Sequence, residues 1–309
     1  MSEQKTGLII CGVGGRYTIR MADGSLVYVR ARGAFRHSGA TPLVGDTVDV
    51  GLEPDGSGKI LSIHPRKNQL IRPPMANLDI LFAVVAAANP APSTLVLDKL
   101  LTVADFLHIS PVVIITKTDL GGVSDQLLRI YQGAGFPVFS VSTEEDEGFA
   151  SLSAYIAENC KGKLSCFAGA SGVGKSTLTN RLFPHLQVAV GDTSHRIERG
   201  KQTTRHVELF PLSDQPNCGY LADTPGFGML DFVHFDFYRR EDLPYTFREF
   251  LPHLPDCRYT DCTHTKEEEC GIRQALARGE IAPERYESFL AIYEELKDKR
   301  PWDRAPKGT

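Results

Sequence analysis

One segment of this sequence has the spacing of a phosphate-binding loop, in which a glycine and four further residues precede Gly-Lys-Ser or Gly-Lys-Thr. Backbone N–H groups of such a loop surround phosphate oxygens, and the start of the following helix favours their negative charge. Lys175 would reach the β- and γ-phosphates of a nucleotide, and Ser176 would offer its hydroxyl to Mg²⁺. The loop consists of Gly169, Ala170, Ser171, Gly172, Val173, Gly174, Lys175, Ser176 and Thr177.

The elements around this loop favour a nucleotide site over a chance glycine-rich turn. Residues 164–168 form a short apolar run, which is typical of a buried parallel strand. Residues 178–183 continue as the first turns of a helix. A phosphate-binding loop needs this order of strand, loop and helix.

A second motif indicates which base the nucleotide carries. Thr116-Lys117-Thr118-Asp119 follows a buried strand predicted at 111–115, and it is similar to the Asn-Lys-x-Asp guanine motif of GTPases, with threonine in the first position. The Asp119 carboxylate could accept hydrogen bonds from N1–H and the exocyclic amine of guanine, which adenine cannot supply, while the Lys117 stem would lie along the base. The segment Ser140-Val141-Ser142-Thr143, after the next predicted strand, resembles a further guanine-contacting loop, and Ser142 is its candidate binding residue. These residues predict GTP rather than ATP.

Two further polar segments are candidates for contacts with Mg²⁺ and the γ-phosphate. Asp223-Thr224-Pro225-Gly226 follows a predicted strand and has the Asp-x-x-Gly pattern, in which the carboxylate reaches Mg²⁺ and the glycine N–H meets the γ-phosphate. Thr203 and Thr204 lie in the polar loop after the phosphate-loop helix, where a switch threonine would close over Mg²⁺. Both threonines fit this role, and we favour Thr204.

A cluster of three cysteines and one histidine predicts a metal site near the C-terminus. The residues are Cys257, Cys262, His264 and Cys270. Three thiolates and one imidazole fit a closed tetrahedral Zn²⁺ site, which has a structural role because no ligand position is left open for chemistry. The alternative is a set of scattered structural cysteines. The remaining cysteines lie in or beside apolar segments and are predicted to be core residues: Cys11, Cys160, Cys166 and Cys218.

Residues 1–68 are predicted to form a separate module of short strands, at 7–11, 16–21, 26–30, 46–52 and 59–63. Five short strands favour an OB-fold barrel, a common platform for nucleic acid, and an SH3-like barrel or a purely structural cap are the alternatives. The module holds nine Lys and Arg against six Asp and Glu, whereas the whole chain has a net charge of −4. This excess favours a polyanionic partner. Arg30, Arg32, Arg36 and His37 could contact RNA phosphates.

After this module the pattern changes to alternating strands and helices. Strands are predicted at 80–86, 111–115, 137–141, 164–168, 207–210 and 218–222, with helices from Ser93, at 124–134 and at 149–160. This alternation predicts a doubly wound, mostly parallel α/β sheet. From about 236 the chain reads as helical, including an amphipathic helix at 283–299. The predicted domains are a barrel (1–68), an α/β domain (69–235) and a helical metal-binding domain (236–309).

Composition is that of an ordinary globular protein, with 309 residues, 42% hydrophobic residues and 23% charged residues. No apolar run approaches the roughly 20 residues of a membrane span, and the N-terminal residues lack the pattern of a signal peptide. An odd number of cysteines, three of them near a histidine, favours a reducing compartment. We therefore expect a cytoplasmic protein without membrane contact.

The order of the motifs indicates the family. In ordinary GTPases the phosphate loop comes first and the guanine motif comes last, whereas here 116–119 precedes 169–177, 200–204 and 223–226. The sequence therefore has the motif order of a circularly permuted GTPase. With a small barrel before these motifs and a Cys/His cluster after them, residues 5–290 resemble the RsgA (YjeQ/YloQ) family of ribosome small-subunit-dependent GTPases. The resemblance implies a monomer that binds the 30S subunit and its 16S rRNA late in maturation, hydrolyses GTP to GDP in response, and then leaves.

The sequence lacks one group that ordinary GTPases use for hydrolysis. A Gln soon after Asp-x-x-Gly orients the attacking water in Ras-like GTPases, but Gly226 is followed by Phe227-Gly228-Met229. Some members of the resembling family use a downstream histidine, and His234 stands at that position; an ordinary surface or capping histidine is the alternative. The candidate catalytic residues are thus His234, Thr204 and Lys175. A P-loop ATPase or kinase is disfavoured by Asp119, and a pure RNA-binding protein with a degenerate nucleotide site is disfavoured by Lys175, Ser176 and Asp223. The alternative function is that of a non-catalytic rRNA-binding assembly protein that uses the nucleotide only as a conformational switch.

Overall fold

The computed structural model describes residues 3–30, 41–52, 58–71, 73–186, 207–215, 217–223 and 238–297. Its described residues fall into two compact units, which are treated separately below. The first comprises Met1–Ile80, Ala154–Phe167 and Thr179–Phe227, and the second comprises Leu81–Ser153, Ala168–Leu178 and Gly228–Thr309. Within the described ranges, no helix combines the length and the apolar character needed to cross a membrane.

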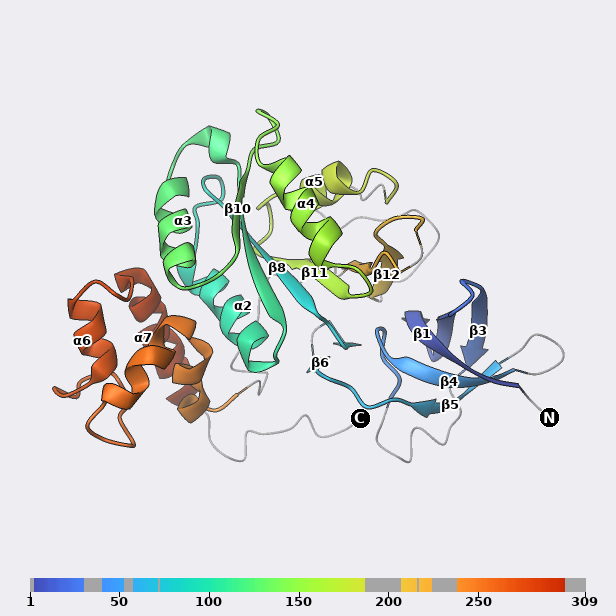
Figure 1. The fold of residues 1–309 in the computed structure, drawn as a ribbon, viewed down its shortest axis with the longest axis horizontal. Helices are drawn as coiled ribbons and strands as arrows, with labels where there is room; N and C mark the ends of the chain where they lie inside the picture. The colour runs from blue at the N-terminus through green and yellow to red at the C-terminus, as the bar shows by residue number, and fades with distance from the viewer. Residues whose placement is uncertain are drawn as a thin grey trace. The chain divides into compact units, whose positions relative to one another are not determined.

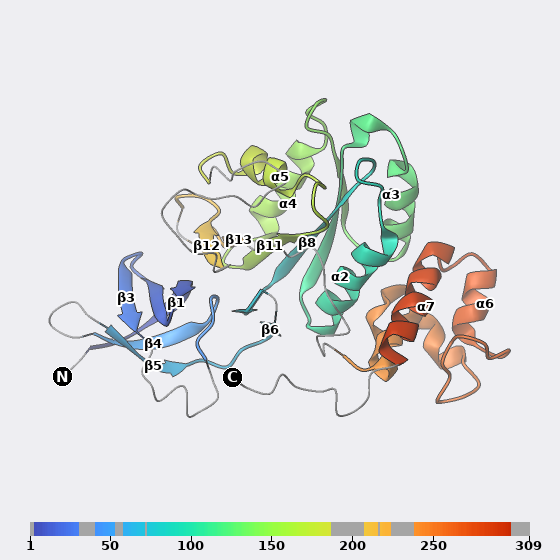
Figure 2. The same ribbon diagram turned by 180° about the vertical axis from the view of Figure 1, so that it is seen from behind.

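The first unit begins with a closed five-stranded barrel (Figures 1 and 2). Its strands follow the order β1-β2-β3-β5-β4, and β4 pairs again with β1 to close the ring. β3 and β5 are parallel, whereas the other pairs are antiparallel. This order confirms the predicted OB-fold. The strands are β1 (Glu3–Val13), β2 (Arg16–Met21), β3 (Leu26–Arg30), β4 (Thr47–Leu52) and β5 (Gly58–Ile63).

The barrel interior is filled by side chains that alternate along its strands. Ile9, Ile19, Val48 and Val50 are completely buried, and Ile60 is almost so. The alternation is what a sheet with one buried face requires. β1 starts four residues before the predicted strand because Glu3 to Thr6 pair with β4 from Leu52 to Asp49. Polar residues at a strand end give no hydropathy signal, so the sequence did not predict this extension.

The first unit also contains a short hairpin and three further strands. β11 and β13 are parallel, β12 is antiparallel to β13, and β12 meets β1 at the pair Cys11 and Glu208. The strands predicted at 164–168, 207–210 and 218–222 are therefore present with small shifts at their ends. These elements are β6 (Gln69–Leu70), β7 (Met75–Ala76), β11 (Leu164–Ala168), β12 (Glu208–Pro211) and β13 (Tyr220–Asp223).

The second unit contains the strands β8 (Ile80–Ala86), β9 (Ser110–Thr116) and β10 (Val138–Val141), in the order β10-β9-β8. All seven residues of β8 are buried, as predicted for a strand covered on both faces. Alternate residues of β8 and β9 pack against two helices, α2 (Thr94–Phe106) and α3 (Ser124–Gly133), which lie together in Figure 1. The shared core includes Ala83, Val85, Val113, Ile115, Leu97, Leu101, Leu127, Ile130 and Tyr131.

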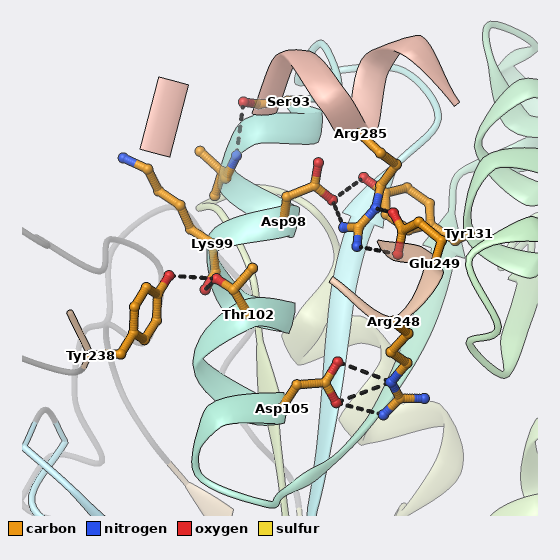
Figure 3. Close-up of polar contacts among 11 residues, drawn as sticks. Ser93, Asp98, Lys99, Thr102, Asp105, Tyr131, Tyr238, Arg248, Glu249 and Arg285 are labelled. Atoms are coloured by element: carbon orange, nitrogen blue, oxygen red, sulfur yellow. Dashed lines mark hydrogen bonds and ion pairs between the residues drawn. The ribbon is translucent and has the colours of Figure 1, made fainter. Parts of the chain in front are cut away.

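The predicted helices of the α/β region are confirmed. Ser93 is the N-cap of α2, since its Oγ accepts a hydrogen bond from the Val96 N–H at 3.3 Å (Figure 3). A single 3₁₀ turn, η1 (Thr118–Leu120), lies between β9 and α3. The remaining helices are α4 (Phe149–Asn159) and α5 (Lys175–Leu182).

The C-terminal part of the second unit is helical, but it begins with 3₁₀ rather than α-helix. Pro244, Pro252 and Pro255 lie inside the first two segments, and prolines lack the N–H that an α-helix needs. Phe247, Phe250 and Phe289 are fully buried and pack ring against ring, with centroids 4.9–5.6 Å apart. The elements are η2 (Arg240–Thr246), η3 (Arg248–Asp256), α6 (Gly271–Ala277) and α7 (Pro283–Lys297).

A buried ionic cluster joins α2 to these C-terminal helices (Figure 3). Arg285 of α7 donates from Nη1 to Asp98 Oδ1 at 2.5 Å and from Nε to Glu249 Oε1 at 2.6 Å. Tyr131 donates its hydroxyl to the same Asp98 oxygen at 2.9 Å. The exposed fraction of the side chains is only 1% for Arg285, 0% for Asp98 and 5% for Glu249. Consequently each charge depends on its partners rather than on water.

Three more polar contacts follow the same helix, and Figure 3 shows those of Asp105 and Thr102. Arg248 clamps the Asp105 carboxylate with two nitrogens, at 2.6 Å and 2.9 Å. Lys99 Nζ contacts both carboxylate oxygens of Glu295 at 2.6 Å, and the hydroxyls of Thr102 and Tyr238 lie 2.8 Å apart. In addition, Tyr286, next to Arg285 in α7, donates its hydroxyl to the His264 carbonyl at 2.7 Å. α2 is therefore held on its polar face by the C-terminal helices.

Candidate nucleotide and metal sites

The predicted phosphate loop lies between β11 and α5, as the motif requires. Gly169 has φ +154°, and a Cβ there would lie 2.2 Å from the Val84 carbonyl oxygen, so the position excludes a side chain. Gly174 has φ +96°. Lys175 Nζ donates to the carbonyl oxygens of Gly169 and Ala170 at 2.8 Å, and burial lowers the pKa of Lys175. The ammonium is thus held over the loop that would surround the phosphates, while Ser176 and Thr177 lie in the first turn of α5.

Two residues of the predicted guanine motif form hydrogen bonds with the phosphate loop. Thr116, the last residue of β9, donates its hydroxyl to the Val173 carbonyl at 2.6 Å. Lys117 adopts φ +56° and donates Nζ to the Gly172 carbonyl at 2.8 Å and to the Asn89 carbonyl. Thr116 and Lys117 therefore connect the predicted guanine motif to the phosphate loop. The Asn89 contact could not be predicted, because a backbone carbonyl leaves no signal in the sequence.

Asp119 and Ser142 are brought together as the predicted base-recognition pair. Ser142 is fully buried, and its Oγ donates to Asp119 Oδ1 at 2.7 Å. The same Oγ accepts the backbone N–H of Glu145 at 3.1 Å, which fixes the hydroxyl rotamer. Asp119 is the middle residue of η1, which begins directly after Lys117. The hydrogen bond from Ser142 orients the carboxylate that would face guanine.

Ser142→Ala should therefore weaken GDP binding by about 3–10-fold. The variant lacks the hydrogen bond that orients the Asp119 carboxylate, and such a bond contributes roughly 1 kcal/mol. The affinity of the purified variant for a fluorescent GDP analogue measures this loss. Thr143→Ala, at the exposed neighbouring position, is the matched control and should bind as the unchanged protein does. Equal affinities for both variants would contradict a role for Ser142.

Several predicted residues lie outside the described ranges: Thr203, Thr204, Gly226 and His234. The same is true of Arg32, Arg36 and His37 in the barrel. Asp223 is the last residue of β13 and pairs through its backbone with Glu208. Roles for these residues in Mg²⁺ binding, water activation or RNA contact stay predictions.

The four predicted metal ligands converge on one point. One ligand atom from each of Cys257, Cys262, His264 and Cys270 lies within 4.8 Å of the others. His264 Nδ1 is 3.5 Å from Sγ of Cys257 and of Cys270, and those two sulfurs are 4.0 Å apart. In a tetrahedral site with Zn²⁺ bonds of about 2.3 Å to sulfur and 2.0 Å to nitrogen, a nitrogen and a sulfur ligand lie roughly 3.5 Å apart and two sulfur ligands roughly 3.8 Å apart. The distances between these ligand atoms therefore fit Zn²⁺. Burial lowers the pKa of His264, which favours the neutral imidazole that binds metals.

The other cysteines divide into two groups. Cys160 and Cys166 are completely buried, as predicted for core residues, and burial raises the pKa of Cys160 to about 11. The prediction is wrong for Cys11 and Cys218, which are only partly buried. Cys11 follows a register shift in β1, and Cys218 lies in the turn before β13, where its thiol donates to the Ser213 carbonyl at 3.1 Å. Apolar neighbours in sequence therefore did not guarantee an inward side chain.

Comparison with known proteins identifies the family. The family models for the RsgA GTPase and the RsgA N-terminal domain match residues 63–233 and 6–60. The Small ribosomal subunit biogenesis GTPase RsgA of Geobacillus thermodenitrificans (strain NG80-2) is 39% identical over 300 residues, which cover 96% of this chain and 98% of that protein. The RsgA of Shouchella clausii (strain KSM-K16) is also 39% identical, over 95% of this chain and 98% of its own.

Two solved structures have the same fold. YjeQ from Thermotoga maritima superposes with a TM-score of 0.78 at 31% identity, covering 96% of this chain and 100% of its own. YloQ, described as a circularly permuted GTPase, gives a TM-score of 0.76 at 32% identity, with 97% of each chain covered. The motif order of this chain agrees with the description of YloQ as circularly permuted. The chain therefore belongs to the RsgA family of circularly permuted GTPases, which hydrolyse GTP.

Proposed function

We propose that this chain binds the 30S ribosomal subunit late in its maturation, hydrolyses GTP to GDP and phosphate when the subunit stimulates it, and then dissociates. The relatives are named for small-subunit biogenesis, which supports the choice of partner. The observation that carries the proposal is the connection of the guanine motif to the phosphate loop through Thr116 and Lys117. This connection places the Asp119 carboxylate, which would accept hydrogen bonds from guanine and not from adenine, next to the phosphate loop, which supports GTP over the ATP of a P-loop ATPase or kinase.

The barrel supports RNA as a partner through one of its outer faces. Tyr28 of β3 is 71% exposed, and it pairs with Thr18 of β2. Arg16 pairs with Arg30 two residues along the same two strands, and Arg30 pairs with Lys59 of β5. β2, β3 and β5 contain no acidic residue. An aromatic ring beside cationic side chains suits stacked bases and phosphates, so we assign 16S rRNA to this face.

The water-orienting group is proposed to be supplied on the ribosome. The Gln of Ras-like enzymes is missing after Gly226, so hydrolysis by the free protein should be slow. On docking, Thr204 would close over Mg²⁺, and His234 or an RNA group would reach the attacking water. Ser176, Thr204 and Asp223 are the proposed Mg²⁺ ligands.

The Cys/His cluster is proposed to hold one structural Zn²⁺, since its donors and spacings fit that ion. Bound zinc would supply folding free energy to the loop between Cys257 and Cys270. We further propose a cytoplasmic monomer with domain limits at 68 and 235.

The test is GTP turnover by the purified protein alone, with 30S subunits and with 50S subunits. Strong stimulation by 30S alone is expected. Equal slow rates in all three conditions would leave a GTPase whose partner is wrongly assigned. Tyr28→Ala, measured in the same assay, should require more 30S for half-maximal stimulation without changing the rate of the free protein; Tyr245→Ala, also a highly exposed tyrosine at 67%, is the control.

A further inference from the structure

The loop that carries the metal ligands is organised around one carboxylate, Glu267. Its Oε1 accepts the hydroxyl of Thr263 at 2.6 Å and the backbone N–H of Thr263 at 3.1 Å. Its Oε2 accepts the backbone N–H groups of Thr265 and Lys266, both at 3.2 Å. The donors therefore come from both sides of His264, the ligand in the middle of the loop.

This position in the loop needs such support. Cys262 and His264 are separated by one residue, so the chain must turn sharply for both to point at one centre. His264 has φ +59°, a left-handed conformation that costs a residue with a Cβ about 1 kcal/mol or more. The turn also gathers N–H groups that a β-sheet or helix would otherwise satisfy. A carboxylate that accepts them offsets part of both costs.

Two neighbouring helices hold the same loop. Arg273 of α6 donates Nη1 to the Glu267 carbonyl at 2.7 Å, and Tyr286 of α7 donates to the His264 carbonyl. Glu267 itself is not among the four residues whose ligand atoms converge. Both of its carboxylate oxygens are already used as acceptors for the loop. The carboxylate therefore acts on the metal site through the loop rather than as a ligand.

We propose that Glu267 is a positioning residue for the metal centre: its carboxylate sets the 263–266 turn so that His264 Nδ1 meets the three thiolates. The inference rests on the proposed zinc site. It makes metal affinity depend on a side chain that does not touch the ion. Groups outside the coordination sphere that orient ligands typically account for 10–100-fold in metal affinity.

The experiment compares Glu267→Gln with Glu268→Gln in the full-length protein. Glutamine keeps the size of the side chain but replaces one acceptor oxygen with an NH₂ donor, which would face N–H groups. Glu268 is the exposed neighbour and serves as the matched control. Zinc affinity is measured by competition with a chromogenic chelator. We expect a zinc dissociation constant about 10–100-fold weaker for Glu267→Gln and no change for Glu268→Gln.

A second readout separates positioning from general damage. With Co²⁺ in place of zinc, Glu267→Gln should reach the unchanged protein's tetrahedral cobalt–thiolate spectrum, but only at higher Co²⁺ concentration. If Glu267→Gln does not fold, Thr263→Val, which removes one of the four donors, should weaken zinc binding several-fold. Wild-type affinity in Glu267→Gln, or in a folded Thr263→Val, would overturn the inference. An unchanged protein that binds no zinc would instead refute the metal assignment itself.

Discussion

Asp119→Ala is expected to weaken GDP binding by about 10²–10⁴-fold, because guanine would lose two charge-assisted hydrogen bonds of roughly 1.5–3 kcal/mol each. The carboxylate accepts a 2.7 Å hydrogen bond from Ser142, which would orient it toward the base. Its removal leaves β9, η1 and the phosphate loop joined through Thr116 and Lys117. The loss should therefore appear in affinity for the base and not in the stability of the fold.

The measurement is titration with a fluorescent GDP analogue, with thermal unfolding to confirm the fold. Asp119→Asn sharpens the test, since its amide can still accept from N1–H but now presents an NH₂ to the 2-position. That donor matches the 2-oxo group of xanthine, so Asp119→Asn should prefer XDP to GDP. Asp125→Ala, at an exposed position in the first turn of α3, is the control. Undiminished GDP affinity in Asp119→Ala would exclude this residue from base recognition.

Of the substitutions proposed here, Arg285→Met should lower the free energy of unfolding most. The substitution leaves Asp98 and Glu249 buried with no cation between them, and breaking a buried ion pair on one side costs about 3–5 kcal/mol. The guanidinium also lies over the Phe247 ring, 4.5 Å from its centroid, so packing is lost as well. At about 2–4 °C per kcal/mol, the unfolding midpoint should fall by roughly 6–20 °C.

The pH dependence of this deficit has a definite sign. Burial raises the pKa of Asp98, and the Arg285 charge opposes that shift, so removing the arginine raises the pKa in the folded protein further. A carboxyl group whose pKa is higher in the folded protein than in the unfolded chain binds more protons in the folded state. The free energy of unfolding therefore rises as the pH falls. The loss of stability in Arg285→Met, relative to the unchanged protein, should become smaller as the pH is lowered from 8 to 5.

Thermal scans at several pH values check both statements. Arg278→Met is the control, because Arg278 pairs with Glu280 at an exposed site and such pairs contribute about 0–1 kcal/mol. A midpoint equally unchanged in both variants would mean that the buried cluster does not hold the fold together.

The sequence predicted the parts of the site that depend on short motifs. The phosphate loop, the guanine motif and the Cys/His cluster each lie within about fifteen residues, and the type of each residue fixes its chemistry. Strand and helix positions followed from apolar runs, and Ser93 was predicted as the α2 N-cap and confirmed in that position. The family followed from the order of these motifs together with the barrel and the Cys/His cluster, and the α/β fold class followed from the alternation of strands and helices.

Long-range polar contacts could not be predicted in this way. Asp98 and Asp105 occupy the polar face of α2, a pattern that normally indicates solvent. Their partners Arg285 and Arg248 lie 187 and 143 residues away. Nothing in a local pattern pairs charges over such distances. The prolines of η2 and η3 were visible in the sequence, but only the structure shows that they shift the segments to 3₁₀ geometry.

The adjacent residues Arg285 and Tyr286 have a mechanical consequence. Arg285 holds Asp98 of α2, and Tyr286 holds the carbonyl of the proposed metal ligand His264. The first turn of α7 is therefore held at two neighbouring residues, one contacting α2 and the other contacting the Cys/His loop. α2 begins at the loop that contains Asn89, the carbonyl partner of Lys117. By reciprocity of linked equilibria, any change in metal affinity caused by nucleotide must be matched by an equal change in nucleotide affinity caused by metal.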